Sequence, residues 1–337
     1  MLCLGIESTA HTFAASVINC FTSGKTPTIL SDARSVYKPT IGGAGIHPRE
    51  ASRHHAIVSS KIIEEALCFA KTKTSEISVL AYSAGPGLGP CLRIGAVAAR
   101  SISSFYNKPL VPVNHAIAHI ELGIALTDAQ DPLVLLISGG HTLLAIFANK
   151  RWRVIGETLD ITLGQLFDQF GRYLGLSSPC GPDIEQFASK SNLKYIPLPY
   201  TVKGNDITFS GLLSASKREV RSNVSQQDLC YSLQETAFAM LCEVTERALV
   251  VTRKKELLVV GGVAANKRLR EILNRACLRH NVTLNSSPIM YSGDNGVQIA
   301  WTGALDYIFG KNKRLDLSKS FVRQSWRLDK VNIPWKS

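Results

Sequence analysis

Residues 133–147 read LVLLISGGHTLLAIF, and this stretch gives the clearest local indication of the fold. Two apolar runs, Leu133 to Ile137 and Leu143 to Phe147, flank a short turn of small and polar residues, Ser138 to Thr142. Short apolar runs bounded by such turns are typical of buried strands. The stretch therefore predicts a β-hairpin whose glycine tip lets a ligand approach the backbone closely.

The start of the chain has the same organisation. Leu2 to Ile6 predicts a strand, residues 7–12 (ESTAHT) predict a turn rich in hydroxyl groups, and Phe13 to Ile18 predicts a second strand. This repeat of strand, turn and strand indicates two lobes of related architecture. Strands that run into glycine-rich turns and then helices recur at 79–106 and 257–271, so the whole chain is predicted to be α/β.

A chain of 337 residues exceeds the usual size of a single hydrophobic core. We expect a first lobe formed by residues 1–130 plus 295–330, a second lobe formed by residues 131–294, and a tail at 331–337. The dipeptide Asp131-Pro132, which precedes the apolar run of the central hairpin, marks the predicted boundary between the lobes.

The composition is 45% hydrophobic and 19% charged, which is typical of a soluble globular protein. No apolar run approaches the ~18 residues that span a bilayer, and the first residues lack the features of a signal peptide, so we expect a cytoplasmic protein without membrane contact.

The net charge of +12 favours a polyanionic partner, nucleic acid above all. The eight cysteines form no C-x-x-C pair, which excludes a zinc ribbon and favours buried, reduced thiols.

Two histidines stand four residues apart in the stretch NHAIAH, where Asn114 is a competent helix N-cap. On a helix, His115 and His119 share one face and can bind one metal ion, zinc or iron. By spacing alone, a surface pair or a pair of buried structural residues is the commoner outcome. A zinc protease would need H-E-x-x-H, and position 116 is alanine. A third ligand is needed, and Asp294 in the turn GDNG is the best candidate, although turn aspartates also bond their own backbone.

Three turns suit a phosphate or a nucleobase. They are the hydroxyl tip at Ser8 and Thr9, the turn from Ser138 to Gly140, and Gly261-Gly262. Each signal is weak alone. Together they describe phosphate-binding hairpins from two lobes that face an adenosine pocket, as in actin-like ATPases and sugar kinases.

Nine motifs in a fixed order carry a family resemblance: GIESTAHT, GGAGIHPREASRHHA, AGPGLGPCLRIG, NHAIAH, SGGHT, GETLDITLGQLFDQFGR, LPYTVKGNDITFSG, VVGGVAANKRLRE and YSGDNGVQIAWTG. The chain resembles the tRNA N6-adenosine threonylcarbamoyltransferases, which are the bacterial TsaD proteins and the catalytic subunits of the archaeal and eukaryotic KEOPS complexes. The resemblance covers nearly the whole chain and is closest to the archaeal form. It implies a two-lobed actin-like ATPase (ASKHA) fold, in which each lobe is a mixed sheet flanked by helices.

The resemblance also implies the roles of individual residues. His115, His119 and Asp294 correspond to the metal ligands. The residues that correspond to the adenylate-binding set are Leu136, Ile137, Ser138, Gly139, Gly140, Asp168, Gly181, Glu185 and Asn266. One departure concerns the metal, because archaeal members contribute a tyrosine from just before V-S-G-G, whereas this chain has Leu136 and Ile137 there, followed by His141 as in bacterial members.

The implied activity is transfer of the threonylcarbamoyl group from threonylcarbamoyl-AMP to N6 of adenosine 37 in tRNAs that read ANN codons, which forms t6A. One divalent metal per chain, Fe²⁺ or Zn²⁺, and ATP or threonylcarbamoyl-AMP are the implied ligands. The implied partners are tRNA and, as separate chains, a kinase-like subunit and small dimerising and tRNA-recruiting subunits. No general base is identifiable. The main alternative is an actin-like small-molecule kinase; a metalloprotease and a non-enzymatic scaffold that binds nucleotide and tRNA are further alternatives.

Overall fold

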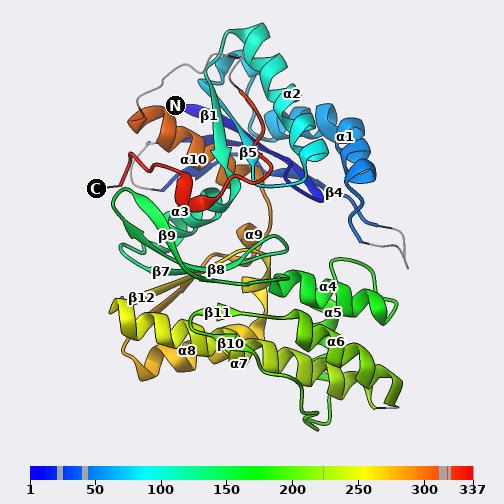
Figure 1. The fold of residues 1–337 in the computed structure, drawn as a ribbon. Helices are drawn as coiled ribbons and strands as arrows, with labels where there is room; N and C mark the ends of the chain where they lie inside the picture. Colours follow the sequence, from blue (N-terminus) through cyan, green and yellow to red (C-terminus); the bar gives the residue numbers. More distant parts are fainter. Residues whose placement is uncertain (21–25, 40–44, 223, 311–316, 318–319, 337) are drawn as a thin grey trace.

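The computed structural model describes residues 1–20, 26–39, 45–222, 224–310, 317 and 320–336. Figure 1 shows two sheets, one above the other, with helices on both. The first sheet has the order β3-β2-β1-β5-β6, and β4 also pairs with β2. Its strands are β1 (Leu2–Glu7), β2 (Thr12–Asn19), β3 (Thr28–Ile29), β4 (Ala33–Val36), β5 (Val79–Gly85) and β6 (Leu110–Asn114).

Side chains alternate across the first sheet and make two cores. On one face, Leu4 and Tyr82 pack with α1 (Pro48–Phe69) and α2 (Gly89–Tyr106). On the other face, Cys3 and other buried strand residues pack with α3 (His115–Thr127) and α10 (Gly296–Phe309). The α1–α2 pair and the α3–α10 pair therefore cover opposite faces of the sheet.

The second sheet repeats this design. An antiparallel meander, β7-β8-β9, is followed by β12 and β13, which run parallel to β7. Its strands are β7 (Leu133–Ile137), β8 (Thr142–Ala148), β9 (Arg151–Glu157), β12 (Glu256–Val260) and β13 (Thr283–Ser286). The first sheet likewise has an antiparallel hairpin, β1-β2, beside the parallel strands β5 and β6. The prediction that each lobe is a mixed sheet flanked by helices is confirmed.

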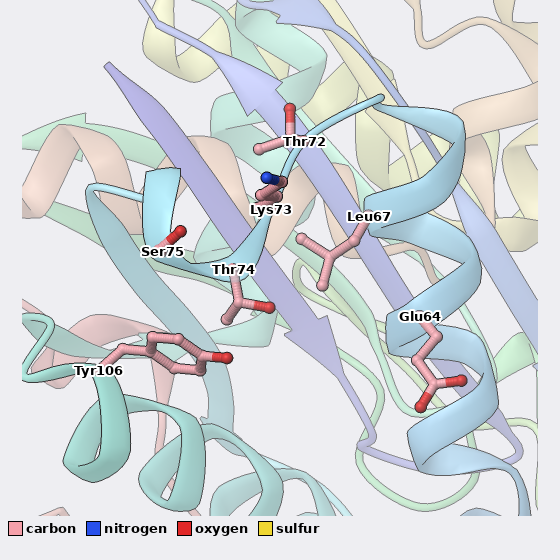
Figure 2. A pocket seen from close by; sticks show the side chains of 7 residues that line it. All are labelled: Glu64, Leu67, Thr72, Lys73, Thr74, Ser75 and Tyr106. Carbon is pink, nitrogen blue, oxygen red and sulfur yellow. The ribbon is translucent and has the colours of Figure 1, made fainter.

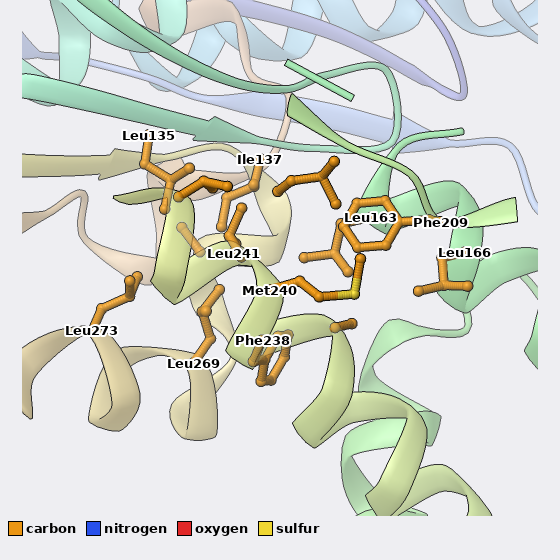
Figure 3. Packing of buried hydrophobic residues seen from close by; sticks show 14 of the residues in the cluster. Leu135, Ile137, Leu163, Leu166, Phe209, Phe238, Met240, Leu241, Leu269 and Leu273 are labelled. Atoms are coloured by element: carbon orange, nitrogen blue, oxygen red, sulfur yellow. The ribbon is translucent and has the colours of Figure 1, made fainter. Parts of the chain in front are cut away.

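The core of the second lobe forms below its sheet. The helices that build it are α4 (Leu163–Tyr173), α5 (Gly181–Ser189), α6 (Ser210–Glu219), α7 (Gln226–Thr252) and α8 (Lys267–Arg279). Figure 3 shows Leu135 and Ile137 of β7 pointing toward Phe238 and Met240 of α7, with Leu269 of α8 beside them. The long helix α7 has no single apolar face, because buried residues occur on several of its sides. A small two-stranded sheet, β10 (Val202–Lys203) with β11 (Asp206–Ile207), borders this core.

A fourth apolar cluster packs α3, which also contacts the first sheet, against the second sheet. Ile117 and Ile120 of α3 pack in it against Leu136 of β7 and Val260 of β12. The C-terminal segment 320–336 completes the cluster with the fully buried side chain of Ile333. The helix that carries both predicted metal histidines is therefore packed between the sheets. In the described residues, no helix is long and apolar enough to cross a membrane.

Candidate metal centre

The helix α3 places His115 and His119 one turn apart at its N-terminal end. Strand β6 ends at Asn114, whose Oδ1 accepts hydrogen bonds from the backbone N–H groups of Ala116 (3.0 Å) and Ile117 (3.1 Å). This cap fixes the first turn of the helix, as predicted from the sequence. The two histidine side chains are buried, and their ring centroids lie 4.6 Å apart with the rings nearly perpendicular.

Asp294 reaches the histidines from the junction between two helices. It follows α9 (Ile289–Ser292) and precedes α10, which Asn295 caps by accepting a hydrogen bond from the N–H of Gln298 (2.9 Å). Oδ1 of Asp294 lies 3.4 Å from Nε2 of His115 and 3.4 Å from Nε2 of His119. The tertiary fold thus gathers the three predicted ligands at one point.

This donor set fits a divalent metal ion. One ligand atom from each of His115, His119 and Asp294 lies within 4.8 Å of the other two. Two imidazole nitrogens and a carboxylate oxygen are a combination with which proteins hold zinc and iron. Nε2 of His119 is buried without a hydrogen-bond partner, which is costly unless a ligand engages it. The three side chains can therefore hold one ion.

Glu7 completes the centre, and the sequence did not single it out. It is the last residue of β1 and is fully buried. Its Oε2 lies 2.8 Å from Nδ1 of His115, and its Oε1 accepts a hydrogen bond from the N–H of Thr9 (2.6 Å). A carboxylate on Nδ1 holds the proton there and turns Nε2 toward the metal. The signal in the sequence that could have identified Glu7 was an acidic residue directly after the predicted buried strand Leu2 to Ile6.

Charge and burial set the protonation states of the three ligands. Burial alone would lower the pKa of His115, but the carboxylates of Glu7 and Asp294 outweigh it and raise this pKa to about 9. Burial lowers the pKa of His119 despite its contact with Asp294. Burial would raise the pKa of Asp294, yet the two histidines hold it well below its usual range. Because a ligating imidazole must be neutral, a metal competes with a proton at His115.

The predicted phosphate turn from Ser138 to Gly140 follows the C-terminal end of β7, the central strand of the second sheet. Oγ of Ser138 accepts hydrogen bonds from the N–H groups of Gly140 (3.2 Å) and His141 (3.1 Å). Gly139 and Gly140 are exposed, and no protein atom lies within 4 Å of where a Cβ would stand on either. The side chains of Leu136 and Ile137 are fully buried, so a ligand could reach only the backbone of these two residues.

A second glycine turn lies beside the first because β7 and β12 are parallel neighbours. Gly261 follows β12 with a φ of +97°, and a Cβ on it would stand 2.3 Å from the carbonyl oxygen of Ile137. Only glycine permits this approach and this backbone conformation. Space remains open around Gly262, where no atom lies within 4 Å of a Cβ position.

The remaining predicted adenylate residues meet around the start of α5. Oδ1 of Asp168 accepts a hydrogen bond from the N–H of Cys180 (2.7 Å), the residue before Gly181. Glu185 accepts one from the N–H of Lys267 (2.8 Å), and Lys267 follows Asn266, the N-cap of α8. The helices α4, α5 and α8 thus bring together Asp168, Gly181, Glu185 and Asn266.

The hydroxyl tip of the first hairpin is covered. Ser8 and Thr9 are both buried. The N–H of Ser8 donates to Oγ of Ser83 (2.9 Å), and Oγ of Ser8 lies against Gly95 of α2, where a Cβ would stand 2.2 Å away. Direct access of a phosphate to these two side chains would require displacement of the β5–α2 region.

A separate open hollow lies at the C-terminal ends of α1 and α2. Figure 2 shows Leu67 and Glu64 of α1, Thr74 of the short 3₁₀ helix at Thr74–Glu76, and Tyr106 of α2 around it. The pair α1 and α2 covers the face of the first sheet opposite α3. This hollow therefore belongs to a different part of the surface from the histidine cluster.

Residues 28–301 match the family model described as TsaD: tRNA N6-adenosine threonylcarbamoyltransferase. The chain belongs to this family. A protein of that name from Staphylothermus marinus is 47% identical over 339 residues, which cover 98% of this chain and 99% of that protein. A probable bifunctional tRNA threonylcarbamoyladenosine biosynthesis protein from Methanocaldococcus jannaschii is 47% identical over 335 residues, which cover 99% of this chain and 60% of that protein. The predicted family is confirmed.

Solved structures support the fold independently. Full-length HypF in its phosphate- and nucleotide-bound form aligns with a TM-score of 0.61 at 12% identity, over 93% of this chain and 47% of HypF. The activator of the 2-hydroxyisocaproyl-CoA dehydratase from Clostridium difficile aligns with a TM-score of 0.53 at 10% identity, over 94% of this chain and 99% of the activator. The predicted two-lobed actin-like ATPase fold is confirmed.

In this member of the family, no tyrosine stands before the serine-glycine turn. Leu136 packs into the cluster between the sheets, and the ring of His141 faces His115 instead, with 6.5 Å between the ring centroids. Burial lowers the pKa of His141 to about 3, helped by the nearby His115 and His119. Nδ1 of His141 is buried without a hydrogen-bond partner, so a neutral imidazole adjoins the predicted ligands.

Proposed function

We propose that this chain transfers the threonylcarbamoyl group of threonylcarbamoyl-AMP to N6 of adenosine 37 in tRNAs that read ANN codons. The family membership over nearly the whole chain supports this activity. The observation that carries the proposal is the buried convergence of His115, His119 and Asp294 beside an open glycine turn. An actin-like small-molecule kinase, the alternative from the sequence, is not favoured because the similar full-length proteins are named transferases.

His115, His119 and Asp294 would hold one divalent metal, Fe²⁺ or Zn²⁺. Such an ion, when bound, supplies a Lewis acid that stabilises charge on phosphoryl and carbonyl oxygens. Glu7 keeps Nε2 of His115 directed at the ligand position, and the cap by Asn114 holds the helix turn that carries His115. These contacts organise the site before substrate arrives.

The adenylate would span the two groups of second-lobe residues. The bare backbone at Gly139 and Gly140 suits a phosphate, since nothing of the protein occupies the space above it. The polar cluster of Asp168, Glu185 and Asn266 suits the adenosine, whose hydroxyl and amino groups need donors and acceptors. The fixed turns would hold the donor nucleotide in one orientation for attack on its carbonyl.

In the reaction, the N6 amine of the tRNA adenosine attacks the carbamoyl carbonyl carbon. A carbon–nitrogen bond forms, the bond from that carbon to the phosphate oxygen breaks, and AMP leaves with the electron pair. The amine loses one proton, and we assign no residue as its acceptor. The protein contributes mainly by positioning the two substrates and by stabilising charge as it develops on oxygen.

The proposal extends to organisation and partners. We assign the metal histidines to a first lobe of residues 1–130 plus 295–330. We assign Asp294 and the adenylate motifs to a second lobe of residues 131–294. The partners would be tRNA and separate KEOPS-type chains, namely a kinase-like subunit and small dimerising and tRNA-recruiting subunits. The compartment would be the cytoplasm. The net charge of +12 supports a tRNA substrate.

The test uses His115→Ala and His119→Ala in a mixture reconstituted with the partner subunits, ATP, threonylcarbamoyl-AMP and tRNA. We expect loss of both tightly bound metal and modified adenosine, measured by elemental analysis and by mass spectrometry of digested tRNA. His280→Ala, at the half-buried C-cap of α8 where Nε2 lies 3.1 Å from Oε1 of Glu246, is the matched control and should keep wild-type metal content and activity. Full modification by a variant without metal would overturn the assigned metal role. ATP-dependent phosphorylation of a small molecule, without any transfer to tRNA, would support the kinase instead.

A further inference from the structure

The ends of α4 and α6 carry a group of cations around one aromatic ring. Nζ of Lys217 lies 5.6 Å from the centroid of the Tyr173 ring, and Nε of Arg221 donates a hydrogen bond to the Tyr173 hydroxyl (3.3 Å). Arg172 and Arg218 stand next to these residues in the sequence, in the last turns of α4 and α6. We call Arg172, Tyr173, Lys217, Arg218 and Arg221 the α4–α6 basic surface.

These cations lack the acidic partners that three other arginines of the second lobe have. Arg268 is bound by Glu235, Arg279 by Glu246, and Arg247 by Glu243. Within the described part of the chain, no carboxylate oxygen lies within 4.0 Å of a charged nitrogen of the α4–α6 basic surface. Its positive charge is therefore not neutralised by the protein and is free to attract an anion.

The helix α4 connects this surface to the nucleotide turn. At its start, Oγ1 of Thr162 donates a hydrogen bond to the carbonyl of Gly139 (2.9 Å), and the N–H of Leu163 donates to Oγ1 of Thr142 (2.9 Å). Tyr173 is the last residue of the helix, which at 1.5 Å per residue is about 16 Å long. The α4–α6 basic surface thus lies one helix length from the predicted phosphate site.

The same surface meets the first lobe. A Cβ on Gly45 would stand 2.9 Å from Nη1 of Arg172, so this guanidinium lies against the segment that leads into α1. Two further exposed arginines, Arg49 and Arg53, follow on the first turns of α1. Arg172 therefore connects the α4–α6 basic surface to the segment before α1, whose first turns carry further positive charge.

We propose that the α4–α6 basic surface docks the phosphate backbone of the RNA loop whose adenosine enters the site. This inference rests on the proposed function and assigns a location to its RNA substrate. Arginine and lysine suit phosphates, and an exposed tyrosine ring suits an unstacked base of a single-stranded loop. An acidic protein segment is the competing partner, but it would leave the ring without a comparable role.

The experiment measures binding of a fluorescently labelled anticodon stem-loop to the full chain over a series of salt concentrations. The variant is Lys217→Gln with Arg218→Gln and Arg221→Gln. Each phosphate contact to a single strand contributes about 0.7 to the slope of log affinity against log salt, so the slope should fall by about 2. The control removes the same charge from exposed positions of another surface, through Lys255→Gln, Arg275→Gln and Arg279→Gln, and should keep the wild-type slope.

A second readout separates docking from chemistry. In the reconstituted modification assay, the α4–α6 variant should raise the KM for tRNA about tenfold while kcat and metal content stay at wild-type values. A wild-type salt slope and KM in this variant would overturn the proposal. Unchanged RNA binding with loss of binding to a partner subunit would assign the surface to protein and also overturn it. A wild-type chain that forms no modified adenosine would refute the proposed function, whereas the stem-loop slopes would still decide whether this surface binds RNA.

Discussion

Replacing Glu7 by glutamine should weaken metal binding without removing a ligand. Oε2 of Glu7 lies 2.8 Å from Nδ1 of His115 in a fully buried position. The amide has the same shape but no charge, so it holds the imidazole proton and the ring orientation less firmly. Removing a carboxylate behind a ligating histidine typically costs 10- to 100-fold in metal affinity, or about 1.4–2.8 kcal/mol.

The assay is competition for zinc or iron(II) against a chromophoric chelator, with purified wild-type and variant chains at the same pH. Glu64→Gln, an exposed residue of α1, changes the net charge equally and serves as the control. Thermal unfolding of both metal-free variants reports whether the fold is retained. A Glu7→Gln chain that is folded and binds metal within twofold of wild type would refute the positioning role of Glu7.

Three further predictions follow from burial and packing. Burial lowers the pKa of His55 from about 6.5 to about 4, so the unfolded chain binds a proton that the folded chain excludes; the free energy of unfolding should fall by about 2 kcal/mol between pH 7 and pH 5. Urea unfolding at both pH values should show a loss about 2 kcal/mol smaller in His55→Leu than in wild type. Gly139→Ala should leave stability within about 0.5 kcal/mol of wild type, because its Cβ meets no protein atom, yet weaken AMP binding in calorimetry; unchanged AMP affinity would contradict a phosphate site there. Ile333→Ala should lower the free energy of unfolding by about 2–5 kcal/mol because this side chain is fully buried between the sheets, and a loss under 1 kcal/mol would show that residues 331–336 are not part of the core.

Much of the local structure was predictable because its causes are short-range. The apolar runs around Ser138 to Gly140 predicted β7 and β8, and the residue types at Asn114 and Asn295 favour the caps that begin α3 and α10. The spacing of His115 and His119 placed both on one helix face. By contrast, α6 was not predicted, since its sequence has few apolar residues in a clear helical period.

The GDNG turn made Asp294 the best candidate for a third ligand, and the family resemblance gave it the same role, although no spacing rule connects it to His115. Only the tertiary structure decided what surrounds these ligands. Glu7 is 108 residues from His115 in the chain and reaches it because β1 and β6 flank β5 in one sheet. His141 approaches His115 because α3 packs against the second sheet.

The sequence by itself determined the elements, the turns and the type of donor atoms, since periodicity, capping and glycine geometry act within a few residues. The tertiary structure decided which donors converge, which hydroxyls are covered and which cations stay unpaired. Ser8 and Thr9 show the difference: their turn suits a phosphate locally, yet the packing of α2 against Ser8 buries both side chains. Such outcomes depend on how parallel strands and helices from distant segments pack together, and no local pattern encodes that arrangement.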